Sequence, residues 1–172
     1  MNIHHPLKIP GIICLALILS LVNVTHAYAD GNPAFWQHKV TGDFDIVLTT
    51  LKDSLESNQF IIMGEENLSK GLENNKQILG EDKWNTIGFN RVTSLYFCSL
   101  VFNQEVFNLK MDWSILCPFK AVVYTMKKAP DQIIIQTIRN SYLLKKDKHK
   151  KAKVIGEKID KRIMKAIKDG TS

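Results

Sequence analysis

Hydrophobic positions along the chain follow the two spacings of regular secondary structure. Short apolar runs rich in β-branched and aromatic residues predict strands, whereas apolar residues at every third and fourth position predict helices with one buried face. The predicted strands are residues 36–40, 60–63, 91–99, 119–126 and 133–138. The predicted helices are residues 44–58, 67–72, about 102–110 and 154–168.

The segments between these elements are polar. Residues 73–90 are expected to form a long loop, and residues 112–114 a turn. Residues 127–131 contain Pro130 and predict the turn of a hairpin. This order of elements predicts an α+β fold, a single compact domain over residues 36–172. Its sheet should be mainly antiparallel and covered by helices, with a basic C-terminal helix at 154–168.

The first 29 residues have a different pattern. Residues 11–24 are apolar except for Ser20 and Asn23, and the small residues Ala27 and Ala29 follow. Such a run before small residues is typical of a cleavable signal peptide, and it is shorter than the roughly 20 residues that span a bilayer. We therefore expect cleavage after Ala29 and a periplasmic or secreted protein, which meets the membrane only transiently through its signal peptide.

Cleavage there leaves 143 residues with a formal charge of +5, because the signal carries only Lys8. Residues 30–35 are expected to be a flexible lead into the domain. The remaining chain has two cysteines, Cys98 and Cys117, and two histidines, His38 and His149. These are too few for a disulfide-rich scaffold or a closed structural zinc site.

Two cysteine motifs resemble those of a known family. Tyr96-Phe97-Cys98-Ser99-Leu100 ends one predicted strand, and Leu116-Cys117-Pro118-Phe119 leads into another that contains Val123-Tyr124. Over about residues 36–168 this is similar to the domain of unknown function 302 family. There, a strand ends in Cys-Asn-Pro, and Leu-Pro-Cys opens a strand that ends in Val-Tyr. The resemblance implies a compact domain that tends to form a homodimer, and it implies no settled reaction.

The second motif departs from the family pattern. Phe119 stands where the family has its second cysteine, and Cys117 comes two residues earlier. If extended backbone begins before Pro118, Cys117 shares a face with residue 119 and can form a disulfide with Cys98. If the chain bends at Pro118, Phe119 fills the old thiol site instead. We favour the second arrangement, with two free thiols.

The candidate chemistry of these residues is sparse. There is no Cys-x-x-Cys pair, no spacing that indicates a metal site, and no convergent catalytic set, so no catalytic residue, metal ligand or cofactor is predicted. The leading hypothesis is a non-enzymatic binding or accessory protein, although enzymatic activity stays open. The alternative is a thiol-redox, metal-binding or haem-binding electron-transfer partner that uses Cys98 and Cys117, with copper or haem as its cofactor.

A ligand pocket is expected beside the cysteine motifs, where aromatic residues are concentrated. It would suit a small apolar or soft-metal ligand. The candidate residues are Cys98, Phe102, Phe107, Trp113, Cys117, Pro118 and Phe119.

The C-terminal segment is strongly basic. Eleven Lys and Arg residues lie between positions 145 and 168, while Ile155, Ile159, Ile163 and Ile167 repeat every fourth residue. We expect the isoleucines to pack on the domain or on a partner subunit, with the lysines in water. A membrane-surface or polyanion-binding role is the alternative. Nucleic acid is not expected as a partner, because no aromatic platform lies among the lysines.

Overall fold

Strand β4 (Phe119–Met126) shows how the sequence makes a sheet with two unlike faces. Its residues alternate strictly between buried and half-buried, with Phe119, Ala121, Val123 and Thr125 on the buried side. Successive side chains of a strand point to opposite faces, so this alternation places one face against a core and leaves the other open. The computed structural model describes residues 31–172, and the predicted signal peptide lies outside the described residues.

The five strands form one antiparallel sheet in the order β1-β5-β4-β3-β2. Strand β4 lies at its centre between β3 (Phe89–Cys98) and β5 (Ala129–Ile138). Strand β1 (Phe35–Thr41) is one edge and β2 (Ile61–Asn67) is the other. The predicted α+β class, with a single domain and an antiparallel sheet, is therefore confirmed.

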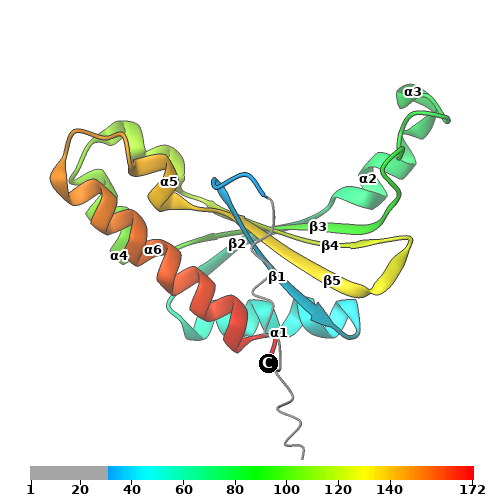
Figure 1. Cartoon of the computed structure of the whole chain (residues 1–172), viewed down its shortest axis with the longest axis horizontal. Coiled ribbons are helices and arrows are strands. Elements are labelled where there is room, and N and C mark those ends of the chain that lie inside the picture. Colours follow the sequence, from blue (N-terminus) through cyan, green and yellow to red (C-terminus); the bar gives the residue numbers. More distant parts are fainter. Residues whose placement is uncertain (1–30) are drawn as a thin grey trace, which may run out of the picture. The chain divides into compact units, whose positions relative to one another are not determined.

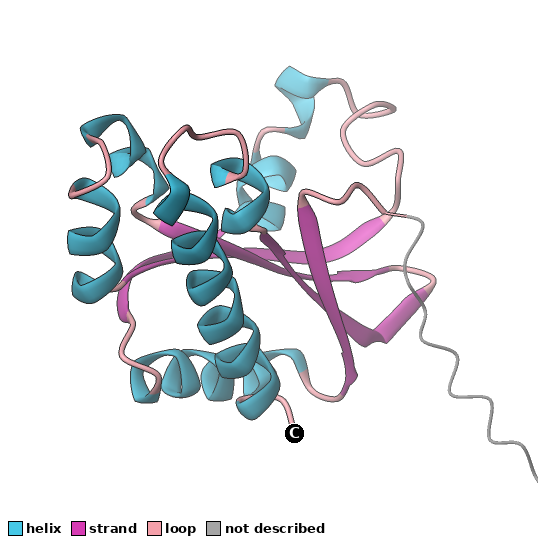
Figure 2. Cartoon of the chain, turned by 60° about the vertical axis from the view of Figure 1, so that its left-hand side comes forward, coloured by secondary structure: helices cyan, strands magenta, loops and turns pink. Residues whose placement is uncertain are grey.

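Helices cover one face of this sheet (Figure 2). The long helices α1 (Phe44–Ser57) and α6 (Lys150–Asp169) contact each other, and α6 also contacts α4 (Leu100–Phe107) and α5 (Asn140–Leu144). A 3₁₀ helix, η1 (Met111–Leu116), follows α4. Helices α2 (Leu68–Asn74) and α3 (Lys76–Leu79) project from the other end of the sheet (Figure 1).

Local sequence explains where α1 begins and which side it buries. The Asp43 carboxylate accepts hydrogen bonds from the backbone N–H groups of Asp45 and Ile46, which satisfies donors that the first turn leaves free. Phe44, Leu48, Leu51 and Leu55 are its buried residues. Their spacing of three and four puts them on one face, which packs into the core.

Helix α6 buries the predicted isoleucine stripe. Ile155, Ile159, Ile163 and Ile167 are all buried within this chain's own core. The stripe is therefore not an exposed surface for a partner subunit, because the sheet and the neighbouring helices already cover it.

Several boundaries differ from the sequence prediction. The expected loop at 73–90 contains α3, and the expected turn at 112–114 lies within η1. Strand β5 already begins at Ala129, which pairs with Met126, so the turn is shorter than residues 127–131. Pro130 is tolerated in this strand because pairing with β1 extends only as far as Gln132, so no β1 acceptor needs a Pro130 N–H.

The basic helix also starts earlier than predicted. Helix α6 begins at Lys150 rather than at residue 154, and α5 before it was not predicted. The extra turn forms because Ala152 is fully buried. A single alanine among lysines gives too weak a hydrophobic pattern for its burial to be recognised in the sequence.

Candidate functional site

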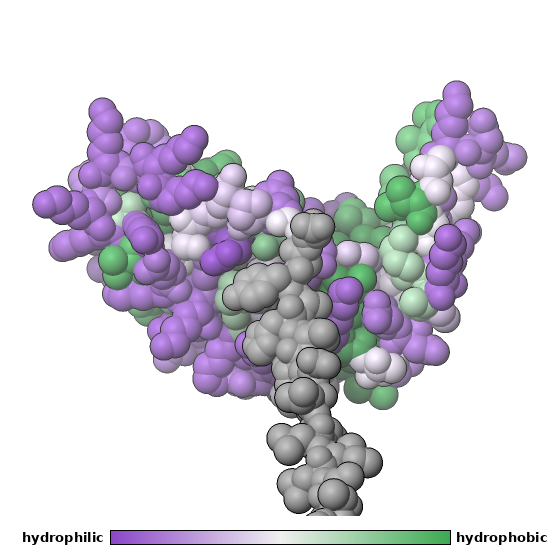
Figure 3. Space-filling view, in the orientation of Figure 1, coloured by the Kyte–Doolittle hydropathy of each residue, from purple (hydrophilic) through white to green (hydrophobic). Residues whose placement is uncertain are grey.

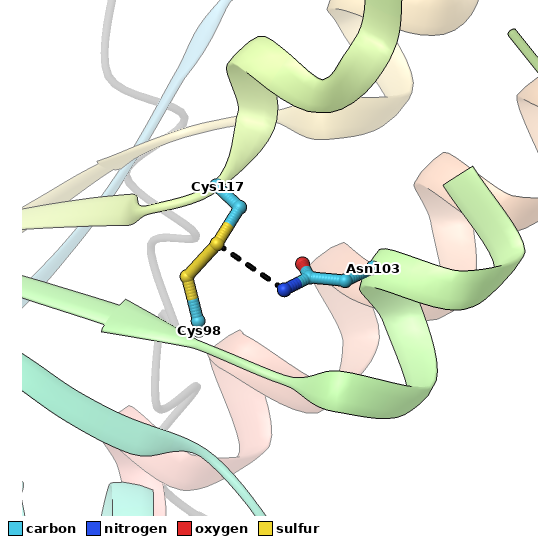
Figure 4. Close-up of a disulfide and its surroundings, with 3 residues drawn as sticks. All are labelled: Cys98, Asn103 and Cys117. Carbon is cyan, nitrogen blue, oxygen red and sulfur yellow. Dashed lines mark hydrogen bonds between the residues drawn. A yellow bond between two sulfur atoms is a disulfide. The ribbon is translucent and has the colours of Figure 1, made fainter. Parts of the chain in front are cut away.

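Cys98 and Cys117 form a disulfide at the end of the sheet (Figure 4). Cys98 is the last residue of β3 and is buried, while Cys117 immediately precedes Pro118 and β4. Their Cα atoms lie 5.7 Å apart, within the usual range for a disulfide. The Asn103 side-chain amide, on α4, donates a hydrogen bond of 3.2 Å to the Cys117 Sγ. The bridge thus closes a loop that contains all of α4 and η1.

This arrangement differs from the expectation of two free thiols. Phe119 does fill the core, where its ring makes an edge contact with Phe60, and it pairs with Phe97 across the β3–β4 ladder. That pairing places Cys117, two residues before Phe119, next to Cys98, one residue after Phe97. The two arrangements considered from the sequence are therefore not exclusive, because strand pairing brings the cysteines together while Phe119 stays inside.

The structure does not bring the other predicted pocket residues together. Phe102 is buried in the core, and the Arg162 guanidinium lies over its ring at 4.6 Å from the centroid. Phe107 is exposed at the end of α4. Trp113, on η1, is half-buried and reaches towards the loop before α6.

Pro118 and Phe119 line a recess with Ile115, Ile138 and Leu143. Its volume is about 110 Å³, well below the roughly 300 Å³ at which small-molecule pockets begin. The recess is therefore too small for the ligand that the aromatic residues suggested.

A larger concave site lies between α4 and α6, which we call the α4–α6 groove. Its volume is about 580 Å³. Leu109, Val154 and Ile155 give it an apolar floor. The remaining residues that line it are Glu105, Asn108, Lys150, Lys151 and Lys158.

The charges around this groove are unbalanced. Lys158 pairs with Glu105 at 3.5 Å, which leaves the one carboxylate of the groove partly neutralised. Lys150 and Lys151 are exposed and form no ion pair with any residue in 31–172. The groove therefore combines an apolar floor with two cations that have no protein partner in the described part of the chain.

The loop before α6 is anchored beside the groove by Trp113. The Trp113 indole Nε1 donates a hydrogen bond of 2.6 Å to the Asp147 Oδ2, and the His149 backbone N–H donates to Oδ1 of the same carboxylate. These two hydrogen bonds, first that from His149 and then that from Trp113, hold the pKa of Asp147 below its usual value. Asp147 therefore stays ionised and fixes a loop that also carries three lysines.

Helix α5 is held against α6 by a buried carboxylate. Asp160 is only 6% exposed and accepts hydrogen bonds from the backbone N–H groups of Asn140 and Ser141 and from both their side chains. Gly156 lies one turn earlier, with its backbone against Ser141. These contacts fix the position of α6, which forms one wall of the α4–α6 groove.

One protein family matches the sequence of this chain. The model of the family described as domain of unknown function DUF302 matches residues 36–169. The chain is a member of the DUF302 family. A comparison with curated proteins finds no match.

A solved structure has the same fold. The crystal structure of an uncharacterised conserved DUF302 protein from Bacillus stearothermophilus superposes with a TM-score of 0.67. The two sequences are 17% identical, and the match covers 82% of this chain and 100% of the other. At this identity the likeness shows a shared fold and not a shared ligand.

In this DUF302 domain the described residues hold no group of three or more His, Cys, Asp or Glu side chains placed to bind a metal ion. No helix within residues 31–172 is both long enough and apolar enough to cross a membrane.

Sequence reasoning missed the α4–α6 groove of the DUF302 domain. Its floor comes from Leu109 and Val154, which are 45 positions apart and belong to no common motif. One signal was present: Val154 is an apolar residue among lysines that does not belong to the isoleucine stripe. Half of its surface is exposed, 51%, because it lies off the buried face of α6.

Proposed function

We propose that this protein is an exported, non-enzymatic binding or accessory protein that holds a small anionic amphiphile in the α4–α6 groove. The observation that supports this is the groove's apolar floor beside Lys150 and Lys151. An acyl or other hydrocarbon chain would cover Leu109 and Val154, and its acidic group would reach the two ammonium groups.

The size and composition of the groove suit such a ligand. A volume of about 580 Å³ lies within the range of small-molecule sites. Each methylene group buried there is worth about 0.8 kcal/mol, so a hydrocarbon chain supplies most of the affinity. The lysines are exposed, so their attraction for an acidic group adds little to the affinity. It mainly favours ligands with a negative charge over ligands with a positive one.

A binding role fits the groove better than catalysis. Among the described residues that line it there is no cysteine, serine, threonine or histidine to act as a nucleophile or base. Its carboxylate, on Glu105, faces Lys158. The lysines can hold an anion in place, whereas Glu105 is already paired with Lys158, so the groove offers no acid and base placed around a reacting bond.

Calorimetric titration with dodecanoate tests this proposal, using residues 30–172 to include the whole folded unit. We expect saturable binding of dodecanoate and no binding of acetate or of dodecyltrimethylammonium. Val154→Asp places a charge on the apolar floor and should lower the affinity for dodecanoate about tenfold or more.

The matched control is Lys128→Glu, in the exposed turn between β4 and β5. Lys151→Glu makes the same change of charge at the groove. If both variants bind dodecanoate equally well, or if the cationic amphiphile binds as tightly as dodecanoate, the groove is not an anionic-amphiphile site.

The export in this proposal is supported by the signal-like pattern of residues 1–29. Expression of the full chain followed by intact-mass measurement tests it. A mature chain that begins at Asp30 or Tyr28 in the extracytoplasmic fraction is expected, and a mass that retains Met1 argues against export.

The disulfide favours a second candidate function, thiol–disulfide exchange. An external dithiol would be oxidised to its own disulfide, while the Cys98–Cys117 bond takes up two electrons and two protons to become two thiols. Cys117 is the more exposed of the two cysteines, so we expect a thiolate to attack its sulfur first. Reduction of the native protein by dithiothreitol as fast as that of the denatured chain would support this role, and much slower reduction would reject it.

A further inference from the structure

Helix α6 carries most of the net charge of this protein. Eight of its residues are Lys or Arg and three are Asp or Glu, an excess of five positive charges. The whole chain has a formal charge of +6. Three more lysines, Lys145, Lys146 and Lys148, lie in the loop before α6. The positive charge is thus concentrated on one helix and its preceding loop, not spread over the surface.

These charges point into solvent along a single stripe. Because the isoleucines of α6 face the core, the opposite side of the helix is exposed. Its residues lie three or four positions apart, which places them on one face of the helix. They are Lys150, Val154, Lys158, Lys161, Lys165 and Lys168, and we call this stripe the outer face of α6.

Few carboxylates neutralise this face. Lys158 pairs with Glu105 and Lys165 with Asp169. Lys150, Lys161 and Lys168 form no ion pair with any residue in 31–172. A helix of 20 residues is about 30 Å long, so the outer face is an extended cationic track. In Figure 3 the left-hand side of the molecule, where Figure 1 places α6, is covered largely by hydrophilic side chains.

One exposed apolar side chain lies among the lysines near the N-terminal end of the track, and two more lie at the end of α4 and the start of η1. Val154 is on the outer face itself. Phe107 precedes and Met111 follows residues 108–110, which lie beside the groove and beside the loop that carries Lys145, Lys146 and Lys148, called the lysine loop below. Both side chains are exposed, Met111 to 64%. Lysines with exposed apolar side chains on or near the same surface are typical of proteins that dock on a membrane interface.

We propose that the outer face of α6, with the lysine loop before it, docks on an anionic lipid membrane. The cations meet lipid headgroups, and Val154, Phe107 and Met111 enter the boundary between headgroups and acyl chains. A soluble polyanion would match the charges but would leave these apolar residues unused. This docking goes beyond the proposed function, because it needs Lys161 and Lys168, which do not line the α4–α6 groove.

Vesicle flotation tests the proposal with residues 30–172. We expect binding to phosphatidylcholine vesicles that contain phosphatidylglycerol, and no binding to vesicles of phosphatidylcholine alone. Raising the salt from about 0.05 M to about 0.5 M shortens the range of these attractions and should lower binding several-fold. Absence of binding to the anionic vesicles at low salt overturns the proposal.

Two variants locate the docking surface. Lys161→Glu with Lys168→Glu should lower vesicle binding at least tenfold, because both charges are reversed on the membrane side. Lys127→Glu with Lys128→Glu, in the turn between β4 and β5, makes the same change of net charge elsewhere and should reduce it much less. Equal losses in the two variants would mean that net charge alone drives adsorption, which overturns the proposed surface.

Met111→Ser separates a membrane from a soluble polyanion. It should lower vesicle binding several-fold and leave any binding of polyphosphate unchanged. If it has no effect on vesicles and polyphosphate binds as tightly as they do, the partner is a polyanion and the membrane proposal is wrong. Dodecanoate binding by the Lys161→Glu, Lys168→Glu variant is measured as well and should be unchanged, because neither lysine lines the groove. A loss of vesicle binding in this variant then reports on the outer face of α6 and not on the groove.

Discussion

Asp160 holds two helices together as a single buried carboxylate. It lies on α6 and accepts hydrogen bonds from the backbone and side chains of Asn140 and Ser141 at the start of α5. Those backbone N–H groups belong to the first turn of α5, where no intrahelical acceptor exists. The carboxylate therefore caps α5 from another helix.

Asp160→Asn should destabilise the protein by about 2–4 kcal/mol, because an amide group replaces one acceptor oxygen and faces N–H donors. Urea unfolding measures the change. Asp53→Asn, on the exposed side of α1, is the control and should change the free energy of unfolding by less than about 0.5 kcal/mol. A similar small change for both variants would show that Asp160 does not hold α5.

Gly156 allows α5 and α6 to approach closely. A Cβ at this position would lie 2.6 Å from the Ser141 Cα and 2.8 Å from its backbone nitrogen. Gly156→Ala should therefore destabilise the protein by about 1–3 kcal/mol, although alanine is the better helix former. Thermal unfolding measures the change, and Gly71→Ala is the matched control.

At Gly71, on α2, a Cβ would meet no atom of residues 31–172 within 4 Å. That variant should be neutral or stabilised by up to about 1 kcal/mol, from helix propensity alone. Stabilisation by both alanines would contradict the close packing of α5 on α6.

His38 makes stability depend on pH. Burial, and then the charge of Lys168, lower the pKa of His38 below its usual value of 6.5. The unfolded chain therefore takes up the proton at a higher pH than the folded chain, so stability falls as the pH drops through about 6.5. We expect His38→Gln to lose less stability than the wild type between pH 8 and pH 5 in urea unfolding. An unchanged pH dependence would show that His38 does not contribute.

At the scale of elements, the disulfide ties α4 and η1 to the sheet. The bridge closes a loop between two residues 19 positions apart. That loop supplies Glu105, Asn108 and Leu109 to the groove and Trp113 to the lysine loop. The bridge should therefore affect the site as well as the stability.

Replacing both cysteines by serine should lower the free energy of unfolding by about 3 kcal/mol, because the unfolded chain gains the entropy of an open loop. Urea unfolding measures this loss, and dodecanoate affinity should fall with it. Thiol titration of the denatured, unreduced wild type provides the check. No free thiol is expected, and two free thiols would contradict the bridge.

At the scale of the whole molecule, no helix within residues 31–172 covers the second face of the sheet. Strand pairing places Tyr124 opposite Ile134 on this face, and Phe35 opposite Ile138. Phe35, Ile61 and Ile138 are each more than 40% exposed. The open face therefore offers the apolar surface that the buried isoleucine stripe of α6 does not.

We predict that two copies of the chain pack through this open face as a homodimer. Light scattering at micromolar concentration should show a dimer, and Ile134→Glu should convert it to a monomer. Ile46→Glu, on the exposed side of α1, is the control and should leave the dimer intact. A wild type that is monomeric at these concentrations would contradict the prediction.

The fold class and most elements could be predicted from the amino-acid sequence. Hydrophobic spacing is a local property, and it was sufficient for α1, β4 and the buried stripe of α6, because whether a residue is buried there depends only on which face of the element it occupies. The two cysteine motifs, with the order of elements, were sufficient for the family.

The tertiary structure alone decided the site. The disulfide depends on the register of β3 and β4, which places Cys117 beside Cys98 while Phe119 stays in the core. The α4–α6 groove depends on how two helices far apart in sequence lie against each other, with Leu109 and Val154 on its floor. Periodicity shows which side of an element is buried, but it does not show which distant element covers it, because that depends on packing among all the elements together.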